Sequence, residues 1–300
     1  MRRIAAGLAL ACLSLSVAQA DDKAKPRAPI EDTYVIAPRH SAEYALTRTE
    51  NFADKGDLVD GVGLTYRDAL SPALNTDIYI YPAGDSATPE TLEAGFRASV
   101  KAAEARGIYT VTQQGDSTPY TLHQRDGGEW QGRMVPLRMK LERGEFESRA
   151  YLFHHGVYAY KVRIDLPVAQ AADLPATADA LVRALLPSIQ VVSVGSCGKQ
   201  MSIDVLKGTD AIPADYVDGV TADGFGMAIR ETDLNAAAAS SSAAAPENNA
   251  VVKLTLLAAQ RQVAHGCTSF PFEPQGEDAA VLKLHYPADF WQSGPANPGR

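Results

Sequence analysis

One segment, Arg149 to Asp165, constrains the fold of this chain most strongly; its sequence is "RAYLFHHGVYAYKVRID". Two histidines and a glycine at its centre separate two runs rich in tyrosine and branched aliphatic residues, a pattern typical of an antiparallel hairpin. A two-residue loop made of the second histidine and the glycine would set Phe153 opposite Tyr158 and Tyr151 opposite Tyr160. The aromatic rings would then form cross-strand pairs on one face of a sheet.

The same register separates the two histidines. His154 would pair with Val157 on the face opposite the aromatic pairs, and His155 would lie in the loop, so the two imidazoles would diverge. The other histidines are isolated in the sequence: His40, His123, His265 and His285. We therefore expect His154 and His155 to be turn residues, and we expect no bound metal and no cofactor. A metal site assembled from histidines distant in the sequence is the alternative.

The first twenty residues have the three parts of a secretory leader. Arg2 and Arg3 precede an apolar stretch from Ile4 to Val17, and Ala18-Gln19-Ala20 offers a small-x-small cleavage site. A core helix is the alternative, but this stretch lacks a polar face. We therefore expect a signal peptide over residues 1–20 and an exported protein, periplasmic or extracellular, whose mature chain begins at Asp21.

The cysteines fit an oxidising compartment. Cys12 could be the acylated cysteine of a bacterial lipoprotein, but the three residues before it, Ala9-Leu10-Ala11, are a poor match to the residues that precede such a cysteine. Leader cleavage discards Cys12 and leaves an even pair, Cys197 and Cys267, which we expect to form a disulfide. Closing this loop would stabilise the fold by about 4 kcal/mol. The loop contains a low-complexity insert, residues 235–249, that resembles a flexible linker.

Charge and hydropathy argue against a nucleic-acid partner and against a transmembrane segment. Removal of the leader with its two arginines takes the formal net charge from -8 to -10. A chain of this charge repels phosphate backbones, so we expect no nucleic-acid partner. Lys253 interrupts the best later apolar run, "AVVKLTLLAAQ", so we expect no transmembrane segment in the mature chain.

Along the chain, residues 21–32 read as a disordered tail, and folded structure begins near Thr33. Residues 76–82 and 108–115 have the composition of strands. Between them, Thr88 is placed to cap a helix with Pro89 at its first position. The apolar stripe of that helix consists of Leu92, Phe96, Val100 and Ala103. A second helix is expected over residues 175–186, with Ala178, Leu181, Val182 and Leu185 facing inward.

This order of elements resembles the α+β arrangement of the PsbP/Mog1-like proteins, a group that includes the DcrB-like proteins of the bacterial envelope. The resemblance is carried by "TDIYIYP", "ETLEAGFRASVKAAEARG", "RAYLFHHGVYAYKVRID" and "ATADALVRALLPSI", and it spans roughly residues 33–186. It implies an antiparallel sheet packed by two helices, and a group of diverse, largely non-catalytic proteins. No functional residue is carried over from it.

The remainder of the chain lies outside this resemblance. Strand-like segments "QMSIDVL", "FGMAIRE" and "AVLKLHYP" and a helix ending near Gly266 indicate a C-terminal α/β extension or small second domain. We therefore expect an α+β domain over residues 33–190, the extension over 191–290 and a disordered tail over 291–300.

Several catalytic and metal motifs fail on spacing. "GSCG" could present Ser196 or Cys197 as the nucleophile of a hydrolase, but it is not a G-x-S-x-G elbow. The expected disulfide would bring His265 near Cys197 and would also remove the thiolate that a cysteine nucleophile needs. The aspartates of "DYVDGVTADGFG" miss the calcium-loop intervals and are typical of turns.

Four cationic residues could form an anion-binding face. If Glu142-Arg143-Gly144 is a three-residue hairpin loop with Gly144 left-handed, one face collects Arg138, Lys140, Lys161 and Arg163. Such a cluster could attract a lipid head group, an acidic glycan or an envelope protein. The alternative is a solvated face neutralised by neighbouring acids, and a one-residue slip would scatter the cluster.

We therefore expect an exported protein with a non-catalytic binding or envelope-support role. A periplasmic hydrolase that uses Ser196 or Cys197 is the alternative. An enzyme should have a pocket where a nucleophile or acid meets a positioned base, whereas a binding module should show a broad surface without perturbed ionisable groups.

Overall fold

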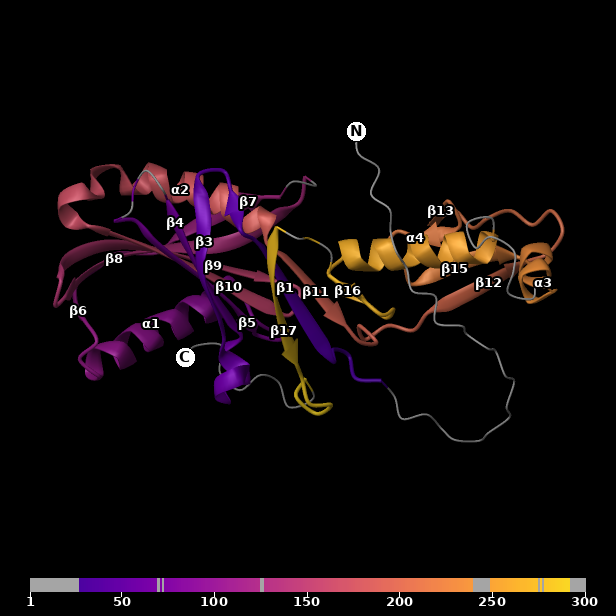
Figure 1. Cartoon of the computed structure of the whole chain (residues 1–300), viewed down its shortest axis with the longest axis horizontal. Coiled ribbons are helices and arrows are strands. Elements are labelled where there is room, and N and C mark those ends of the chain that lie inside the picture. Colours follow the sequence, from indigo (N-terminus) through magenta and orange to yellow (C-terminus); the bar gives the residue numbers. More distant parts are fainter. Residues whose placement is uncertain are drawn as a thin grey trace.

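The computed structural model describes residues 27–68, 71, 73–124, 127–239, 249–274, 276 and 278–291. The expected leader, residues 21–26 of the expected tail, residues 240–248 of the insert and residues 292–300 lie outside the described residues. The protein is an α+β structure in which antiparallel sheet predominates, and this confirms the expected fold class. Figure 1 shows the large sheet with α1 and α2 at one end of the molecule and a smaller sheet with α3 and α4 at the other.

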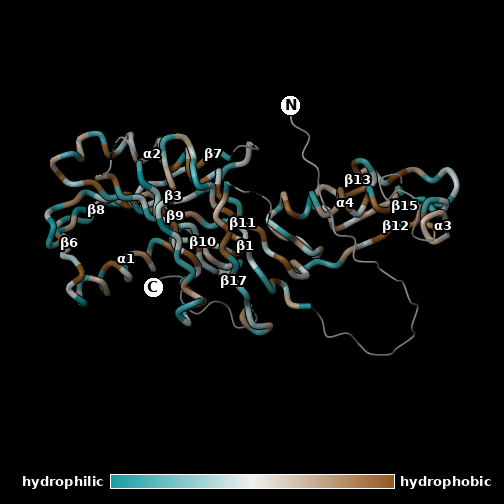
Figure 2. The backbone as a smooth tube through the Cα atoms, in the orientation of Figure 1, coloured by the Kyte–Doolittle hydropathy of each residue, from teal (hydrophilic) through white to brown (hydrophobic). Residues whose placement is uncertain are grey.

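The large sheet is antiparallel throughout, and Figure 2 shows hydrophobic positions alternating with hydrophilic ones along its strands. Its strands, in spatial order, are β2 (His40–Ser41), β3 (Tyr44–Asn51), β4 (Val62–Asp68), β5 (Asn75–Pro82), β10 (Tyr158–Pro167), β9 (Gly144–His155), β8 (Glu129–Leu141) and β6 (Thr110–Gln114), with β7 (Thr118–His123) also paired to β8.

Helix α1 (Pro89–Ala105) covers part of one face of this sheet. Thr88 and Thr91 form a reciprocal capping box, and Pro89 occupies the first turn. The four residues of the expected stripe are the buried ones and pack against β8 and β9. The helix thus begins and buries its side chains as the sequence predicted.

The opposite face is covered by α2 (Leu174–Leu185) and by a second sheet. This sheet has the order β16 (Cys267–Thr268), β11 (Gln190–Val194), β1 (Asp32–Pro38) and β17 (Ala279–His285). Leu181, Val35 and Leu284 lie in one buried core together with aromatic residues of β9 and β10. The two faces of the large sheet therefore have separate cores.

A smaller sheet has the order β12 (Ser202–Leu206), β15 (Gly226–Arg230), β14 (Val220–Thr221) and β13 (Tyr216–Val217). Helix α4 (Ala250–Ala264) packs on it through a core that includes Val220, Met227 and Ala258, and α3 (Glu231–Ala239) follows β15. The first residues of the expected linker therefore belong to α3. Short 3-10 helices are η1 (Phe52–Lys55), η2 (Leu58–Asp60), η3 (Val168–Asp173) and η4 (Leu186–Ser188).

The expected domain boundary at residue 190 stays a prediction. Strand β17 comes from the far side of that boundary, yet it pairs with β1 along its whole length. Leu282, Leu284 and Tyr286 contribute to the core beneath the large sheet. The end of the described chain therefore returns to the first folded strand.

The β9–β10 hairpin differs from its expected register by two residues. The loop is Gly156-Val157 in place of His155-Gly156, with Gly156 at a φ of 60°. Tyr158 pairs with His155, and Phe153 pairs with Tyr160. A glycine at the first central position of a two-residue loop is favoured because it accepts positive φ, which explains the shift. Because the shift is even, the aromatic face is retained.

The β8–β9 hairpin differs from its expected register by one residue, and this corrects the predicted anion-binding face. Gly144 has positive φ as expected, but it pairs with Leu141, so the loop holds two residues and not three. The slip exchanges the faces of β8 relative to β10. Arg138 and Lys140 therefore lie on the α2 side of the sheet, whereas Lys161 and Arg163 lie on the α1 side.

Candidate functional site

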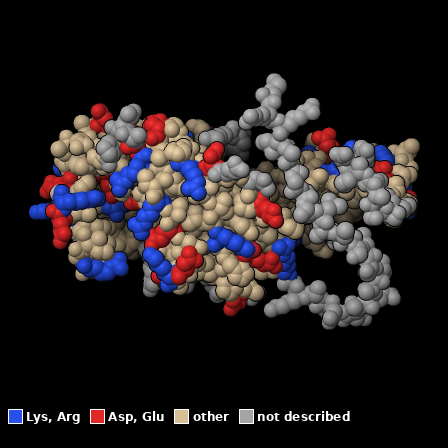
Figure 3. Space-filling model, viewed as in Figure 1, with Lys and Arg blue, Asp and Glu red and all other residues tan. Residues whose placement is uncertain are grey.

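The two separated pairs of cations have different surroundings. On the α2 side, Arg138 lies opposite Glu147 and forms an ion pair with it, and Lys140 lies opposite Glu145. Opposite charges on directly paired strand positions neutralise this part of the sheet. Figure 3 shows the same mixture on the face in view, where Lys and Arg side chains are interspersed with Asp and Glu.

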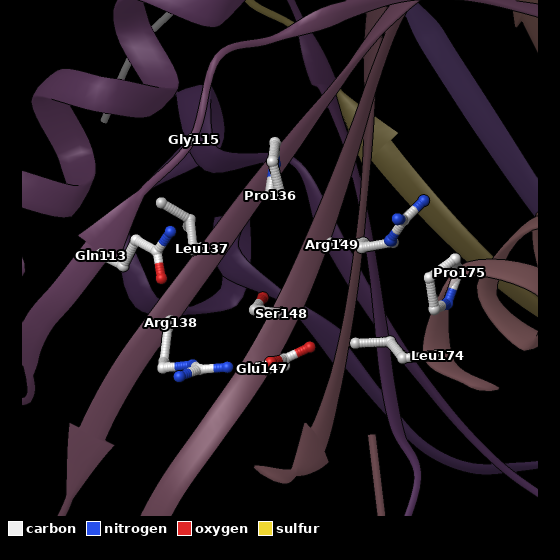
Figure 4. Close-up of a pocket in the computed structure, with 10 residues that line it drawn as sticks. All are labelled: Gln113, Gly115, Pro136, Leu137, Arg138, Glu147, Ser148, Arg149, Leu174 and Pro175. Carbon is white, nitrogen blue, oxygen red and sulfur yellow. Dashed lines mark hydrogen bonds and ion pairs between the residues drawn. The ribbon is translucent and has the colours of Figure 1, made fainter. Parts of the chain in front are cut away.

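A cavity of about 260 Å³ lies on the α2 side beside the Arg138–Glu147 pair. The end of β6, the middle of β8 and β9 and the first turn of α2 enclose it (Figure 4). The lining residues are Gln113, Gly115, Pro136, Leu137, Arg138, Glu147, Ser148, Arg149, Leu174 and Pro175. We call this the α2-side cavity.

Arg149 is the half-buried cation of this cavity. Figure 4 shows Arg138 beside Glu147 on one side and Arg149 on the other, near Pro175. Among the described residues, no carboxylate oxygen lies within 4.0 Å of the Arg149 guanidinium. Arginine never loses its charge in this pH range, so a half-buried guanidinium without a carboxylate partner is suited to an acidic ligand group.

Helix α2 is joined to β9 next to Arg149. The Tyr151 hydroxyl donates a hydrogen bond of 2.5 Å to Asp179 of α2. Burial raises the pKa of Tyr151, and the Asp179 carboxylate raises it further, so the phenol keeps its proton. This contact fixes the helix whose first turn forms one wall of the α2-side cavity.

The remaining walls of the α2-side cavity combine apolar side chains with a side-chain amide. Pro136, Leu174 and Pro175 supply the apolar part, and Gln113 supplies a side-chain amide. Such a combination orients a small ligand by hydrogen bonds while apolar atoms cover its body. The lining includes Ser148 but no histidine or cysteine, so it lacks the imidazole or thiolate partner of a nucleophilic triad.

His154 and His155 lie on opposite faces of β9, which agrees with the expected divergence of the imidazoles. His154 Nε2 lies 2.9 Å from the carbonyl oxygen of Gly84. The His155 ring stacks on Trp130 with ring centres 4.4 Å apart. They occupy the last two positions of β9 next to the loop. No group of three or more His, Cys, Asp or Glu residues placed to hold a metal occurs within the described ranges.

Cys197 and Cys267 form the expected disulfide, with an S–S distance of 2.03 Å. The Cys197 sulfur is therefore no thiolate, and this removes it as a nucleophile. His265 Nε2 lies 3.1 Å from the carbonyl oxygen of Ala222, so it is engaged by the smaller sheet's loop. The part of the hydrolase hypothesis that used Cys197 is wrong in this oxidised state.

Asp223 of "DYVDGVTADGFG" behaves as a turn residue. The Asp223 carboxylate accepts hydrogen bonds from Lys199, from the Thr221 hydroxyl and from the Phe225 backbone. The Lys199 hydrogen bond is the main cause that lowers the pKa of Asp223. These contacts tie β14 to β15, as expected for an aspartate in a turn.

Arg149, Glu147 and Gln113 were not singled out by the sequence. Arg149 and Glu147 belong to the predicted hairpins. They are charged residues at alternate positions of one strand, and this spacing could have indicated that they share a face of the sheet. Their meeting with α2 depends on a helix that begins twenty-five residues after Arg149, and strand alternation alone does not locate that helix.

Within the described part of the chain, none of the helices combines the length and the apolar composition needed to cross a membrane.

No family model matches this chain, and no curated protein matches it. Part of the chain is similar to a cyanobacterial PsbP. This solved structure, CyanoP from Synechocystis sp. PCC 6803, is 11% identical. The match covers 54% of this chain and 93% of CyanoP, with a TM-score of 0.33.

Two further solved structures match with lower TM-scores. A protein from Bacteroides thetaiotaomicron VPI-5482 is 6% identical over 52% of this chain and 44% of its own, with a TM-score of 0.30. PA94 from Pseudomonas aeruginosa is 16% identical over 39% of this chain and 75% of its own, with a TM-score of 0.25. The PsbP match confirms the expected PsbP-like resemblance as a partial likeness of fold, and nothing about function follows from it. The narrower resemblance to DcrB-like proteins stays a prediction.

Proposed function

We propose that this chain is an exported, non-catalytic binding protein whose α2-side cavity receives an acidic saccharide of the cell envelope. The leader pattern and the disulfide support export. The observation that carries the binding proposal is Arg149, a half-buried guanidinium without a carboxylate partner in a cavity of about 260 Å³.

The cavity chemistry favours a sugar acid over a neutral ligand. A guanidinium binds a carboxylate through two parallel hydrogen bonds, and this pairing is both stronger and more directional than a neutral one. Gln113, Arg138 and Glu147 offer further polar groups around the cavity for hydroxyl groups. The cavity of about 260 Å³ is smaller than the pockets of drug-sized ligands, which favours a ligand as small as a single residue of a glycan.

The surroundings favour a glycan over a lipid bilayer. The large apolar side chains that are exposed within the described residues lie elsewhere: Ile108, Ile203, Val205, Ile212, Val217, Leu234, Leu256 and Val281. None of them lines the α2-side cavity. A surface that inserts into a lipid layer needs exposed apolar side chains, so we favour the acidic glycan.

The test compares glucuronate with glucose, since the two differ in the carboxylate. Titration calorimetry should show saturable binding of glucuronate and weaker binding of glucose. Arg149→Gln should weaken glucuronate binding about 10- to 100-fold, because a hydrogen bond to a charged group contributes about 1.5–3 kcal/mol. Arg106→Gln is the matched control, since it removes an exposed arginine at the end of α1 and should leave binding unchanged.

Three outcomes would contradict the proposal. Glucose and glucuronate could bind equally, Arg149→Gln could bind as tightly as the unaltered protein, or neither sugar could bind. Preferential binding to phosphatidylglycerol vesicles, without binding to glucuronate, would replace the glycan with a lipid head group.

A further inference from the structure

The second pair of cations lies on the α1 side of the large sheet, away from the α2-side cavity. Lys161 and Arg163 are two residues apart on β10, so their side chains emerge from the same face about 6.5 Å apart. Helix α1 packs against β8 and β9 on this side. Lys161 instead faces Tyr79 of β5, its direct partner in the ladder.

Lys161 has a half-buried ammonium group with an incomplete set of partners. Its Nζ lies 4.5 Å from the centre of the Tyr79 ring, and that ring stacks on Phe52 at 6.4 Å. No hydrogen bond or ion pair joins the ammonium group to another residue in the described portion of the chain. A partly desolvated cation held only by a ring face is stabilised when a hydrogen-bonded anion joins it.

Arg163 also has donors to spare. Its Nε donates to Asp165 at 3.0 Å, and its Nη2 lies 2.6 Å from the sulfur of Met139. The guanidinium carbon lies 5.4 Å from the centre of the Tyr109 ring. A thioether sulfur is a weak acceptor, and the Tyr109 phenol is a second neighbour of this guanidinium that carries no charge. The guanidinium has five N–H donors, so its outer edge can donate to a further group.

The carboxylates near Lys161 and Arg163 either accept hydrogen bonds from other residues or lie beyond hydrogen-bond distance of Lys161. The Asp77 carboxylate of β5 accepts from Thr65 at 2.7 Å and from Asn75 at 2.6 Å, and Asp165 accepts from Arg163. Asp60 of η2 and Asp77 act on Lys161 through longer-range attraction only. They therefore moderate the positive charge of this face without occupying the donors of Lys161.

The titration of Lys161 is consistent with this arrangement. Burial lowers the pKa of Lys161 to about 8, and the neighbouring charge of Arg163 contributes to the decrease, whereas Asp60 and Asp77 oppose it. Burial raises the pKa of Tyr79 to about 12 and raises that of Tyr109 above its usual value. Lys161 is therefore the group on this face whose charge changes in mildly alkaline solution.

We infer that Lys161 and Arg163 together form a binding site for a small oxyanion of the sulfate or phosphate class, separate from the α2-side cavity. The ammonium group and the outer edge of the guanidinium converge on the anion, and the Tyr79 and Tyr109 rings flank it. The anion supplies the hydrogen-bond acceptors that these two cations lack, and it holds Lys161 in the protonated form.

The test uses sodium sulfate, because the charge of sulfate is constant across the titration of Lys161. Calorimetry should show saturable binding below about pH 8 and a decrease of about tenfold per pH unit above it, since the free lysine must then gain a proton to bind. Lys161→Gln and Arg163→Gln should each abolish binding. Lys161→Arg should retain binding and lose the pH dependence, because arginine stays protonated.

Two further variants separate this site from the other one. Arg149→Gln should bind sulfate normally, even if it loses glucuronate, and Arg106→Gln is the control for an exposed arginine. The inference is overturned if sulfate does not bind, if Lys161→Gln binds as well as the unaltered protein, or if the binding is lost in Arg149→Gln. Retained pH dependence in Lys161→Arg would also overturn it.

Discussion

The partner of each cation, more than its charge, decides what it can do on this sheet. Arg138 and Glu147 satisfy each other on the sheet surface, and their side chains are 39% and 33% exposed. A pair so exposed contributes little to stability, because solvent screens it. Arg149, Lys161 and Arg163 keep donors that no described carboxylate fills, and our two binding proposals rest on them.

The histidine pair supports a prediction at the same scale. Replacing His154 with Asn and His155 with Asp should keep the fold and lower the free energy of unfolding by about 1–3 kcal/mol. The loss comes from the His154 hydrogen bond to Gly84 and from the ring stacking of His155 on Trp130. Urea unfolding followed by circular dichroism measures the change, and His40→Asn is the exposed control.

The metal content of the same variant decides whether these two residues at the end of β9 are structural or bind a metal. The purified protein and the double variant should hold the same, substoichiometric amount of metal. Stoichiometric metal that disappears in the double variant would show that these histidines are ligands.

Among the elements, α1 begins at a reciprocal cap whose contribution one substitution can test. The Thr88 hydroxyl accepts from the Thr91 backbone at 3.2 Å and caps the helix. Thr88→Ala should therefore lower the free energy of unfolding by about 1 kcal/mol, measured as a shift of the urea midpoint. Thr209→Ala, at an exposed turn, should change it by less than about 0.5 kcal/mol. Equal effects of the two variants would show that the cap does not stabilise α1.

Helix α1 could be predicted closely because its signals are local. The cap, the proline and the four-residue stripe all lie within one stretch, and each indicates the same boundaries. The face on which a strand residue lies depends instead on whether the number of residues in the hairpin loop is odd or even. The predicted three-residue loop at Glu142 to Gly144 has two residues, and this single difference moved Arg138 and Lys140 to the other face. In the β9–β10 hairpin the pairing partners shifted by two residues, an even number, so its aromatic face was retained.

For the whole molecule, the disulfide closes a loop of 70 residues that contains the smaller sheet and α4. Replacing Cys197 and Cys267 with Ser should lower the free energy of unfolding by about 4 kcal/mol, because the unfolded chain gains freedom. Urea unfolding measures the loss. Glucuronate binding should persist under folding conditions, because the lining of the α2-side cavity lies outside this loop. Two free thiols found by non-reducing peptide mapping of the native protein would refute the disulfide itself.

The α2-side cavity shows why the site was harder to predict than the fold. Its lining comes from the end of β6, from two strands of a hairpin and from the first turn of α2. The strand and helix patterns were each visible in the sequence, but their meeting at Arg149 depends on how α2 crosses the sheet, which the Tyr151–Asp179 hydrogen bond helps to fix. No local pattern specifies that crossing.

The most direct test of the binding account is to map the bound ligand. Amide NMR spectra of the isotopically labelled protein would be recorded while glucuronate is added. We expect the shifts to concentrate on Gln113, on Arg138, on Glu147 to Arg149 and on the first turn of α2, and to disappear in Arg149→Gln. Shifts centred elsewhere, for example around Tyr79 and Lys161, or no saturable shifts at all, would contradict the account.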